Sequence, residues 1–279
     1  MNNAGTLYVV ATPIGNLKDI TLRALEVLES VDLIAAEDTR HTLKLLNHFS
    51  IKKPLTSYYE HNKQYKGAQI IAQLLEGKHV ALVSDAGTPV ISDPGELLIQ
   101  ECVENDIPIV TVPGACAAVS ALTLSALHTR RFVFYGFLSA KAKERTEELE
   151  QLKYEEKTLI FYEAPHKLKQ MLKDMRNIFG NRRISVCREM TKKYEQVLRF
   201  TLEEAISYFE EEEPKGEFVL VVSGSEEKKA ADFNPFAEMS VREQVHFYMQ
   251  SGMEKKDAIK KCALERDVPK RDVYKEMID

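Results

Sequence analysis

Short apolar runs rich in β-branched residues alternate, along most of this chain, with stretches whose apolar residues recur at helical spacing. Residues such as Leu22, Leu25 and Leu28 have the spacing of an amphipathic helix. Several of the short runs are apolar throughout, which is typical of strands in a sheet that helices cover on both faces. The chain is therefore predicted to be an α/β protein. The predicted strands cover residues 7–11, 33–36, 80–84, 109–112, 132–136, 158–162, 184–188 and 218–223.

Two breaks divide the chain into predicted domains. A Pro-Gly corner at residues 113–114, followed by a helix, separates two α/β lobes, so the first lobe is expected to cover residues 1–113 and the second 114–224. The stretch from Ser223 to Pro235 is polar and contains glycine and proline, which predicts a linker over residues 225–238. Residues 239–279 carry no strand signal and are predicted to form a small helical domain.

The last domain has clear start and stop signals for its helices. Ser240, followed three residues later by Glu243, forms a capping-box pattern, and Gly252 suits the end of the helix that begins there. A second helix is expected over about residues 254–266, and a third with Pro269 in its first turn. Three short helices joined by tight turns resemble a helix-turn-helix module.

Composition limits the class of protein. The four cysteines lie far apart, without a Cys-x-x-Cys pair or a histidine at zinc-finger spacing, so we expect reduced thiols and no metal. No apolar run reaches the ~18 residues of a membrane helix, and the first residues lack the basic segment of a signal peptide. The chain is therefore expected to be cytoplasmic and to have no membrane partner. The net charge is −5, yet residues 141–199 are rich in lysine and arginine, which indicates either a basic face or an ordinary solvated surface.

The first segment with chemical character lies at residues 9–21. A strand leads into a turn that contains Pro13 and Gly15, and Thr21 then opens a helix. Open α/β sheets bind ligands at the carboxyl ends of their strands, so this turn is a candidate ligand contact. The segment has no Gly-x-Gly-x-x-Gly, which argues against a dinucleotide site. An ordinary connection between a strand and a helix is the alternative.

The second segment, residues 36–42, places Glu37, Asp38 and Arg40 at the end of a predicted strand. An adjacent acid and base can orient one another through charge-assisted hydrogen bonds, and a carboxylate there could accept a proton from a hydroxyl group. The alternative is structural, with Asp38 capping the next helix and Arg40 left in solvent.

The third segment, residues 84–95, is a loop dense in glycine, proline and aspartate. Small residues let a ligand approach the backbone, and carboxylates such as Asp85 can bind an ammonium group or ribose hydroxyls; two consecutive turns are the alternative. At the following Pro-Gly corner, backbone N–H groups could meet a carboxylate. Cys116 lies among apolar residues there, without a histidine near it in sequence, which favours a packed thiol over a nucleophile.

Together and in this order, these segments closely resemble the tetrapyrrole methylase superfamily and, more narrowly, the ribosomal RNA small subunit methyltransferase I family. The resemblance covers about residues 6–224, and the tail is similar to the C-terminal helical domain of that family. It implies two α/β lobes with S-adenosylmethionine (SAM) in the cleft between them, and a homodimer. The motifs that carry it lie at residues 11–21, 36–42, 84–95, 112–114, 161–166 and 188–192.

The resemblance also implies which residues hold SAM. Tetrapyrrole-modifying relatives have Gly-Asp-Pro where this chain has Gly-Thr-Pro at residues 87–89, so Thr88 or Asp85 would have to replace the hydrogen bonds of that aspartate. Many relatives also carry serine or threonine near the Pro-Gly corner, where this chain has alanine and cysteine. The expected cofactor contacts are Ile14, Asp85, Thr88, Ile91, Gly114, Ala115, Tyr162, Glu189 and Phe218.

The narrower family implies 2′-O-methylation of a cytidine ribose in the decoding centre of 16S ribosomal RNA on the small subunit. A ribose hydroxyl is a poor nucleophile, so a general base or a polarising cation is expected. The candidate bases are Asp38 and His61, with Arg40 orienting the substrate or a phosphate. Two alternatives stay open: a SAM-dependent methylase of a tetrapyrrole or other small substrate, and an RNA-binding module that has lost SAM. The candidate phosphate contacts of the tail are Lys255, Lys256, Lys260, Lys261, Arg266, Lys270 and Arg271.

Overall fold

The computed structural model describes residues 4–227, 236, 239–266 and 268–277. These residues fall into two compact units, Met1–Glu227 and Lys228–Asp279, and each unit is described by itself. Most of the predicted linker, residues 228–235 and 237–238, lies outside the described residues.

The first half of the large unit is built on a five-stranded sheet in which every strand pair is parallel. The strand order is β3-β2-β4-β1-β5. Each of β2 and β4 is buried at every position, which explains why these strands appear in the sequence as unbroken apolar runs. The strands are β1 (Leu7–Val10), β2 (Leu33–Ala36), β3 (Leu55–Ser57), β4 (Val80–Val83) and β5 (Ile109–Val112).

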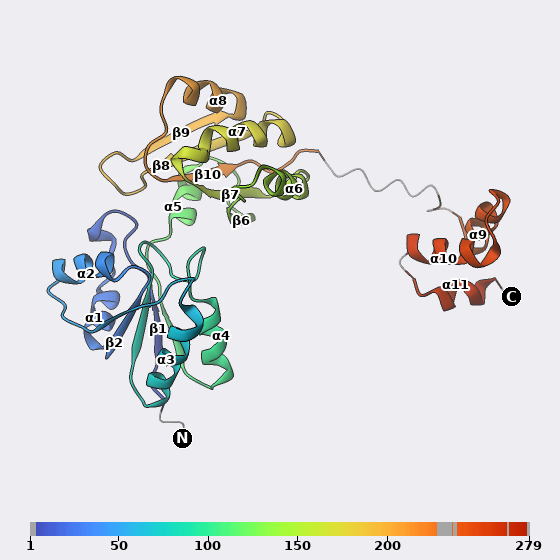
Figure 1. The fold of residues 1–279 in the computed structure, drawn as a ribbon. Coiled ribbons are helices and arrows are strands. Elements are labelled where there is room, and N and C mark those ends of the chain that lie inside the picture. Colours follow the sequence, from blue (N-terminus) through green and yellow to red (C-terminus); the bar gives the residue numbers. More distant parts are fainter. Residues whose placement is uncertain (1–3, 228–235, 237–238, 267, 278–279) are drawn as a thin grey trace. The chain divides into compact units, whose positions relative to one another are not determined.

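Helices cover both faces of this first sheet (Figure 1). On one face, Leu28 and Leu46 of α1 and α2 pack with Ile34 of β2. On the other, Leu74 and Leu98 of α3 and α4 pack in a separate apolar cluster. The sheet is therefore the middle layer of three, as its apolar strands require. The helical elements are η1 (Leu17–Asp19), α1 (Leu22–Ser30), α2 (Thr39–His48), α3 (Lys63–Leu75) and α4 (Glu96–Glu104).

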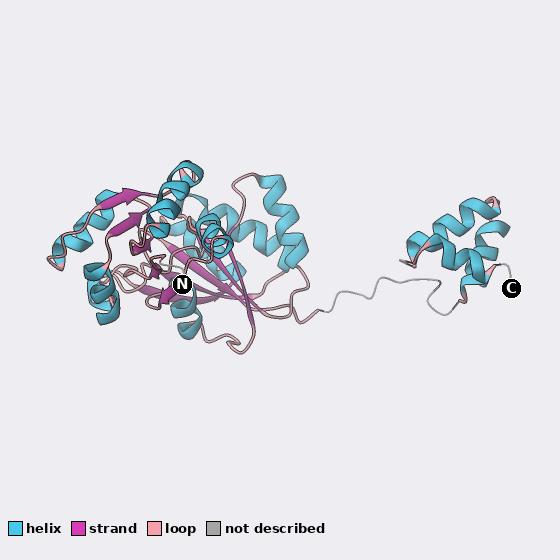
Figure 2. Cartoon of the chain, turned by 90° about the horizontal axis from the view of Figure 1, so that it is seen from below, coloured by secondary structure: helices cyan, strands magenta, loops and turns pink. Residues whose placement is uncertain are grey.

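The second half of the large unit has a mixed sheet in the order β6-β7-β10-β8-β9, in which only β6 and β7 are parallel. Its strands are β6 (Phe132–Phe137), β7 (Thr158–Glu163), β8 (Arg183–Arg188), β9 (Gln196–Thr201) and β10 (Phe218–Val222). Leu149, Leu168 and Phe209 of three helices pack on one face of this sheet, and Ala118 and Ala121 of α5 pack on the other. The helices are α5 (Ala117–Leu124), α6 (Ala142–Leu152), α7 (Pro165–Phe179) and α8 (Leu202–Glu211). Figure 2 shows helices around the strands of both sheets.

The α/β fold class and the eight predicted strands are confirmed, but two further strands were not predicted. The first, β3, spans only three residues, all of them half-buried, and so has no apolar run. The second, β9, lies at the edge of its sheet and includes the exposed Arg199. Short strands and edge strands bury less apolar surface, so their sequences resemble those of loops.

The small unit contains α9 (Val241–Gln250), α10 (Lys255–Glu265) and α11 (Lys270–Glu276). The predicted capping box is present, because the Ser240 side chain accepts from the backbone of Glu243 and the Glu243 side chain accepts from the backbone of Ser240. Gly252 holds the positive φ of 95° that ends the first of these helices. The helices share a core of their own, formed by Val245, Tyr248, Ala258, Ile259, Cys262, Ala263 and Val273.

Candidate functional site

A cavity of about 430 Å³ lies where the carboxyl ends of the first sheet face the second sheet. From the first sheet, Ile14 follows β1, Glu37 follows β2 and Asp85 follows β4. Parallel strands bring their carboxyl ends to one edge, so residues that are distant in the sequence meet at this place. The second sheet adds side chains at the ends of its strands and in adjoining loops, namely Phe137, Tyr162, Glu163, Met190, Glu217, Phe218 and Val219.

Hydrogen bonds and one close contact hold the three loops of the first sheet together. Thr12 and Gly87 exchange two hydrogen bonds, of 2.8 and 3.1 Å, which join the turn after β1 to the loop after β4. The Thr88 hydroxyl donates to the carbonyl oxygen of Ala115 at 3.2 Å, which joins that loop to the Pro-Gly corner. At the corner itself, a Cβ added to Gly114 would lie 2.9 Å from the Cβ of Ala11, so only glycine fits without a shift.

The wall formed by the first sheet is acidic. Glu37, Asp85 and Asp93 all line the cavity. Burial raises the pKa of Glu37, and the charges of Asp93 and Asp85 raise it further. Burial also raises the pKa of Asp93, against a hydrogen bond from Ser84 that lowers it. Such a wall favours a ligand with positive charge, because a cation relieves the repulsion among the carboxylates.

The wall formed by the second sheet is mainly aromatic and apolar. The hydroxyl of Tyr162 accepts a hydrogen bond of 3.2 Å from the backbone N–H of Ala118, which ties β7 to the start of α5. Burial raises the pKa of this tyrosine to about 12. The rings of Phe134 and Phe137 pack edge-on against it, with centroids 5.1 and 5.5 Å away. This wall therefore offers apolar faces on which a flat ring could rest.

The three predicted catalytic residues, Asp38, Arg40 and His61, do not line the main cavity. The Asp38 carboxylate caps α2 by accepting from the backbone N–H of Arg40 at 2.8 Å, and it also accepts from the Arg40 side chain at 3.0 and 2.6 Å. These hydrogen bonds hold the pKa of Asp38 well below its usual range. A carboxylate with so low a pKa is a weak base. The arrangement matches the structural alternative for Asp38. Arg40 is exposed, as that alternative expected, but its side chain is bound to the Asp38 carboxylate.

His61 is exposed in the turn after β3, where its ring lies 6.3 Å from the ring of Tyr59. It lines neither the main cavity nor the smaller cavity that adjoins it. In this conformation of the chain, His61 is therefore not placed to take a proton from a group bound in the cavity.

Most of the predicted cofactor contacts do line the cavity: Ile14, Asp85, Thr88, Ile91, Tyr162 and Phe218. The other three lie behind its wall. Gly114 and Ala115 form the corner described above, and the Glu189 carboxylate accepts from the Lys192 ammonium and from the backbone N–H of Glu217, each at 3.0 Å.

Several residues of the cavity were not predicted as site residues. Glu37 is adjacent to Asp38, and Asp93 lies in the same loop as Asp85. Both line the cavity, but no feature of the sequence distinguishes them from these other acids. Phe137 and Glu163 end β6 and β7, and the rule that ligands bind at strand ends could have indicated them. Cys116, predicted as a packed thiol, is half-buried and lines the cavity.

Within residues 4–227, 236, 239–266 and 268–277, no cluster of three or more histidine, cysteine or acidic side chains is arranged to hold a metal ion. None of the helices in those ranges is both long enough and apolar enough to cross a bilayer.

Comparisons with known proteins place the chain in a family. The profile of the family described as Tetrapyrrole (Corrin/Porphyrin) Methylases matches residues 6–206. The ribosomal RNA small subunit methyltransferase I of Halalkalibacterium halodurans is 51% identical over 98% of this chain and 94% of its own length. The protein of the same name from Bacillus subtilis is 48% identical over 98% of this chain and 94% of its own length.

Solved structures agree on the fold. The methyltransferase CobJ aligns with a TM-score of 0.60 at 16% identity, over 82% of this chain and 98% of its own. The uroporphyrin-III C-methyltransferase from Thermus thermophilus, solved with S-adenosylhomocysteine, aligns with a TM-score of 0.57 at 15% identity, over 78% and 97%. The cavity, the fold and the sequence matches lead to one conclusion: the chain belongs to the tetrapyrrole methylase family and, within it, to the ribosomal RNA small subunit methyltransferase I family.

Proposed function

We propose that this protein transfers a methyl group from SAM to the 2′-hydroxyl of a cytidine in the decoding centre of 16S ribosomal RNA on the small subunit. One observation carries the choice of substrate. The relatives named for ribosomal RNA are 51% and 48% identical to this chain over 98% of its length, whereas the tetrapyrrole enzyme of Thermus thermophilus is 15% identical over 78% of it. The sequence is therefore far more similar to the relatives named for RNA.

The residues of the main cavity fit SAM. Its volume of about 430 Å³ lies in the range of small-molecule sites. SAM carries a positively charged sulfonium and an ammonium group, and Glu37, Asp85 and Asp93 supply negative charge on one wall. Ile14 and Phe218 supply apolar surface for the adenine ring. When bound, SAM would supply the methyl group and a good leaving group.

Glu37 is the residue best suited to act as general base. Its carboxylate lines the cavity, and burial together with neighbouring acids raises its pKa, so it binds a proton more readily than Asp38 does. In the proposed step, the 2′-oxygen forms a bond to the methyl carbon, the sulfur–carbon bond breaks, and the hydroxyl proton passes to the Glu37 carboxylate. Charge is balanced, because the sulfonium becomes a neutral thioether as the carboxylate becomes a neutral acid.

Two finer parts of the proposal concern assembly and location. We propose that the protein acts as a homodimer in the cytoplasm. Apolar side chains that remain exposed on α5 and on the edge strand β6, among them Val119 and Phe132, support a protein partner for this part of the large unit. Light scattering of the purified chain would report the mass of a monomer if this proposal is wrong.

The function is tested with small subunits isolated from a strain that lacks the protein. The purified chain is incubated with these subunits and labelled SAM, and the 16S RNA is then digested and examined by mass spectrometry. The expected result is one new 2′-O-methylcytidine in the decoding centre. Methylation of a tetrapyrrole with no methylation of the RNA would overturn the proposal in favour of a small substrate. Equilibrium dialysis that showed no SAM binding would instead indicate an RNA-binding module.

A further inference from the structure

A second cavity, of about 370 Å³, adjoins the main one in the large unit. The two share Ile14, Asp85, Ala86 and Glu217 as lining residues, so a molecule bound in one would border a molecule bound in the other. The second cavity also extends over the turn after β1 and the first part of α2. If the main cavity holds SAM, the second is where the group that receives the methyl would enter.

The charge of the second cavity differs from that of the first. His41 and Lys44 of α2 line it, and Lys192 lines it from the other half of the unit. Lys18 lies next to Leu17, another lining residue. Among the described residues, the main cavity is thus lined by carboxylates and by no lysine, arginine or histidine, whereas the second cavity adds His41, Lys44 and Lys192 to the shared Asp85 and Glu217.

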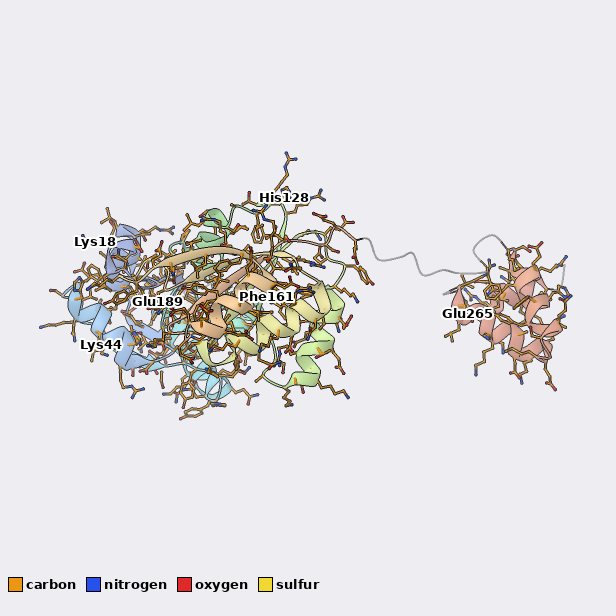
Figure 3. All side chains as sticks on the ribbon, turned by 90° about the horizontal axis from the view of Figure 1, so that it is seen from above. Lys18, Lys44, His128, Phe161, Glu189 and Glu265 are labelled. Atoms are coloured by element: carbon orange, nitrogen blue, oxygen red, sulfur yellow. The ribbon has the colours of Figure 1, made fainter. Side chains whose placement is uncertain are left out.

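The lysines in and beside the second cavity differ in whether they already form ion pairs. The ammonium of Lys192 is bound by Glu189 at 3.0 Å and Glu217 at 2.8 Å. The side chains of Lys18 and Lys44, by contrast, are exposed and form no ion pair among residues 4–227. Figure 3 labels both lysines on the N-terminal half of the large unit. Two exposed lysines that form no ion pair in that range, one lining the cavity and one beside it in the sequence, favour an anionic partner that comes from solution.

We infer that the second cavity binds the phosphodiester backbone of the RNA beside the target nucleotide, with Lys44 and Lys18 contacting its phosphate oxygens. The inference rests on the proposed function and adds the residues that recognise the substrate. A phosphodiester fits better than a small carboxylate, because Lys44 lines the cavity and Lys18, next to the lining residue Leu17, is exposed, so a polymer could contact both and continue past the protein. Binding there would set the ribose next to the methyl donor in the main cavity.

The test compares Lys18→Gln, Lys44→Gln and the double variant with the wild-type chain. The matched control is Lys52→Gln, because Lys52 is also exposed but precedes β3, at the opposite end of the sheet from the cavities. Each protein is assayed for methylation of unmethylated small subunits at several salt concentrations. SAM affinity is measured separately by equilibrium dialysis.

The double variant is expected to raise the KM for small subunits about tenfold at ~0.1 M salt, with little change in kcat or in SAM affinity. The slope of log KM against log salt concentration should decrease by about one for each lysine removed. Lys44→Arg, which keeps the charge, should restore most of the affinity lost in Lys44→Gln.

Two outcomes would overturn the inference: a double variant that matches Lys52→Gln in KM and salt dependence, or one that loses SAM affinity as strongly as RNA affinity. Failure of the proposed function has a different signature, because the wild-type chain itself would then leave the small subunits unmethylated.

Discussion

The backbone N–H of Asn16 donates a hydrogen bond of 3.1 Å to the side-chain oxygen of Thr191. This bond joins the turn after β1 to the loop after β8, and so connects the two halves of the large unit beside the cavities. Thr191 holds a positive φ of 66°, which is unfavourable for a β-branched residue. At the neighbouring Gly15, an added Cβ would lie 2.4 Å from the Cγ of Lys192, so the two segments are in close contact.

Thr191→Val should weaken SAM binding. Valine keeps the shape of threonine but removes the oxygen that accepts from Asn16, a hydrogen bond worth about 0.5–1.5 kcal/mol. The dissociation constant for SAM, measured by calorimetry, should therefore rise about 2- to 10-fold. Thr146→Val is the control, because the Thr146 hydroxyl bonds only within α6. Equal SAM affinity in the two variants would show that the contact does not support the site.

Glu37→Gln should reduce kcat by about 10²–10⁴, the usual contribution of a general base, without loss of folding. The base must be deprotonated to work, so wild-type activity should fall as the pH falls through the pKa of Glu37. Since burial raises that pKa, the fall should begin at a higher pH than for an ordinary carboxyl group. The pH profile of kcat/KM measures this, and the acidic limb should be absent in the variant. A variant with wild-type turnover would remove Glu37 from the chemistry.

Arg145→Ala should destabilise the large unit by about 3–5 kcal/mol, because it leaves the largely buried Asp174 carboxylate without its cationic partner and, among the described residues, with only the hydrogen bond from Gln170. The two side chains are only 9% and 17% exposed and meet at 2.7 Å. Arg145 also donates to the carbonyl oxygens of Ser139 and Ala140. Urea unfolding measures the effect, with Lys143→Ala on the exposed side of α6 as control. A loss no larger than that of the control would contradict this account.

Arg266→Ala should destabilise the small unit. The structure indicates a structural role for Arg266, where the sequence predicted a phosphate contact. The structure shows its guanidinium donating to the Gln244 side chain and to the carbonyl oxygens of Phe236 and Met239. Arg266 is therefore engaged inside the unit, which argues against the phosphate contact predicted for it. Hydrogen exchange of the full chain should show faster exchange in α9 and α10 for Arg266→Ala. Lys260→Ala, which changes an exposed residue, should leave exchange rates unaltered.

Much of the fold was predictable because burial leaves a periodic pattern in the sequence. The unbroken apolar runs of β2 and β4 follow from their position between helix layers. The capping box at Ser240 could be predicted because it depends only on residues three apart. By contrast, β3 and β9 are held by pairing with distant strands, and their own residues do not reveal it.

For the site, the family and the loops that carry the chemistry could be predicted from the residues that follow each strand. Which side chains of those loops face the cavity depends on the folded chain. Asp38 caps α2 and pairs with Arg40, a local arrangement that the sequence already offered as one alternative. Glu37, by contrast, faces the acids Asp85 and Asp93 of a distant loop, which together with burial raise its pKa. Adjacent residues at a strand end point in different directions, and segments far away in the chain set what surrounds the one that faces the cavity.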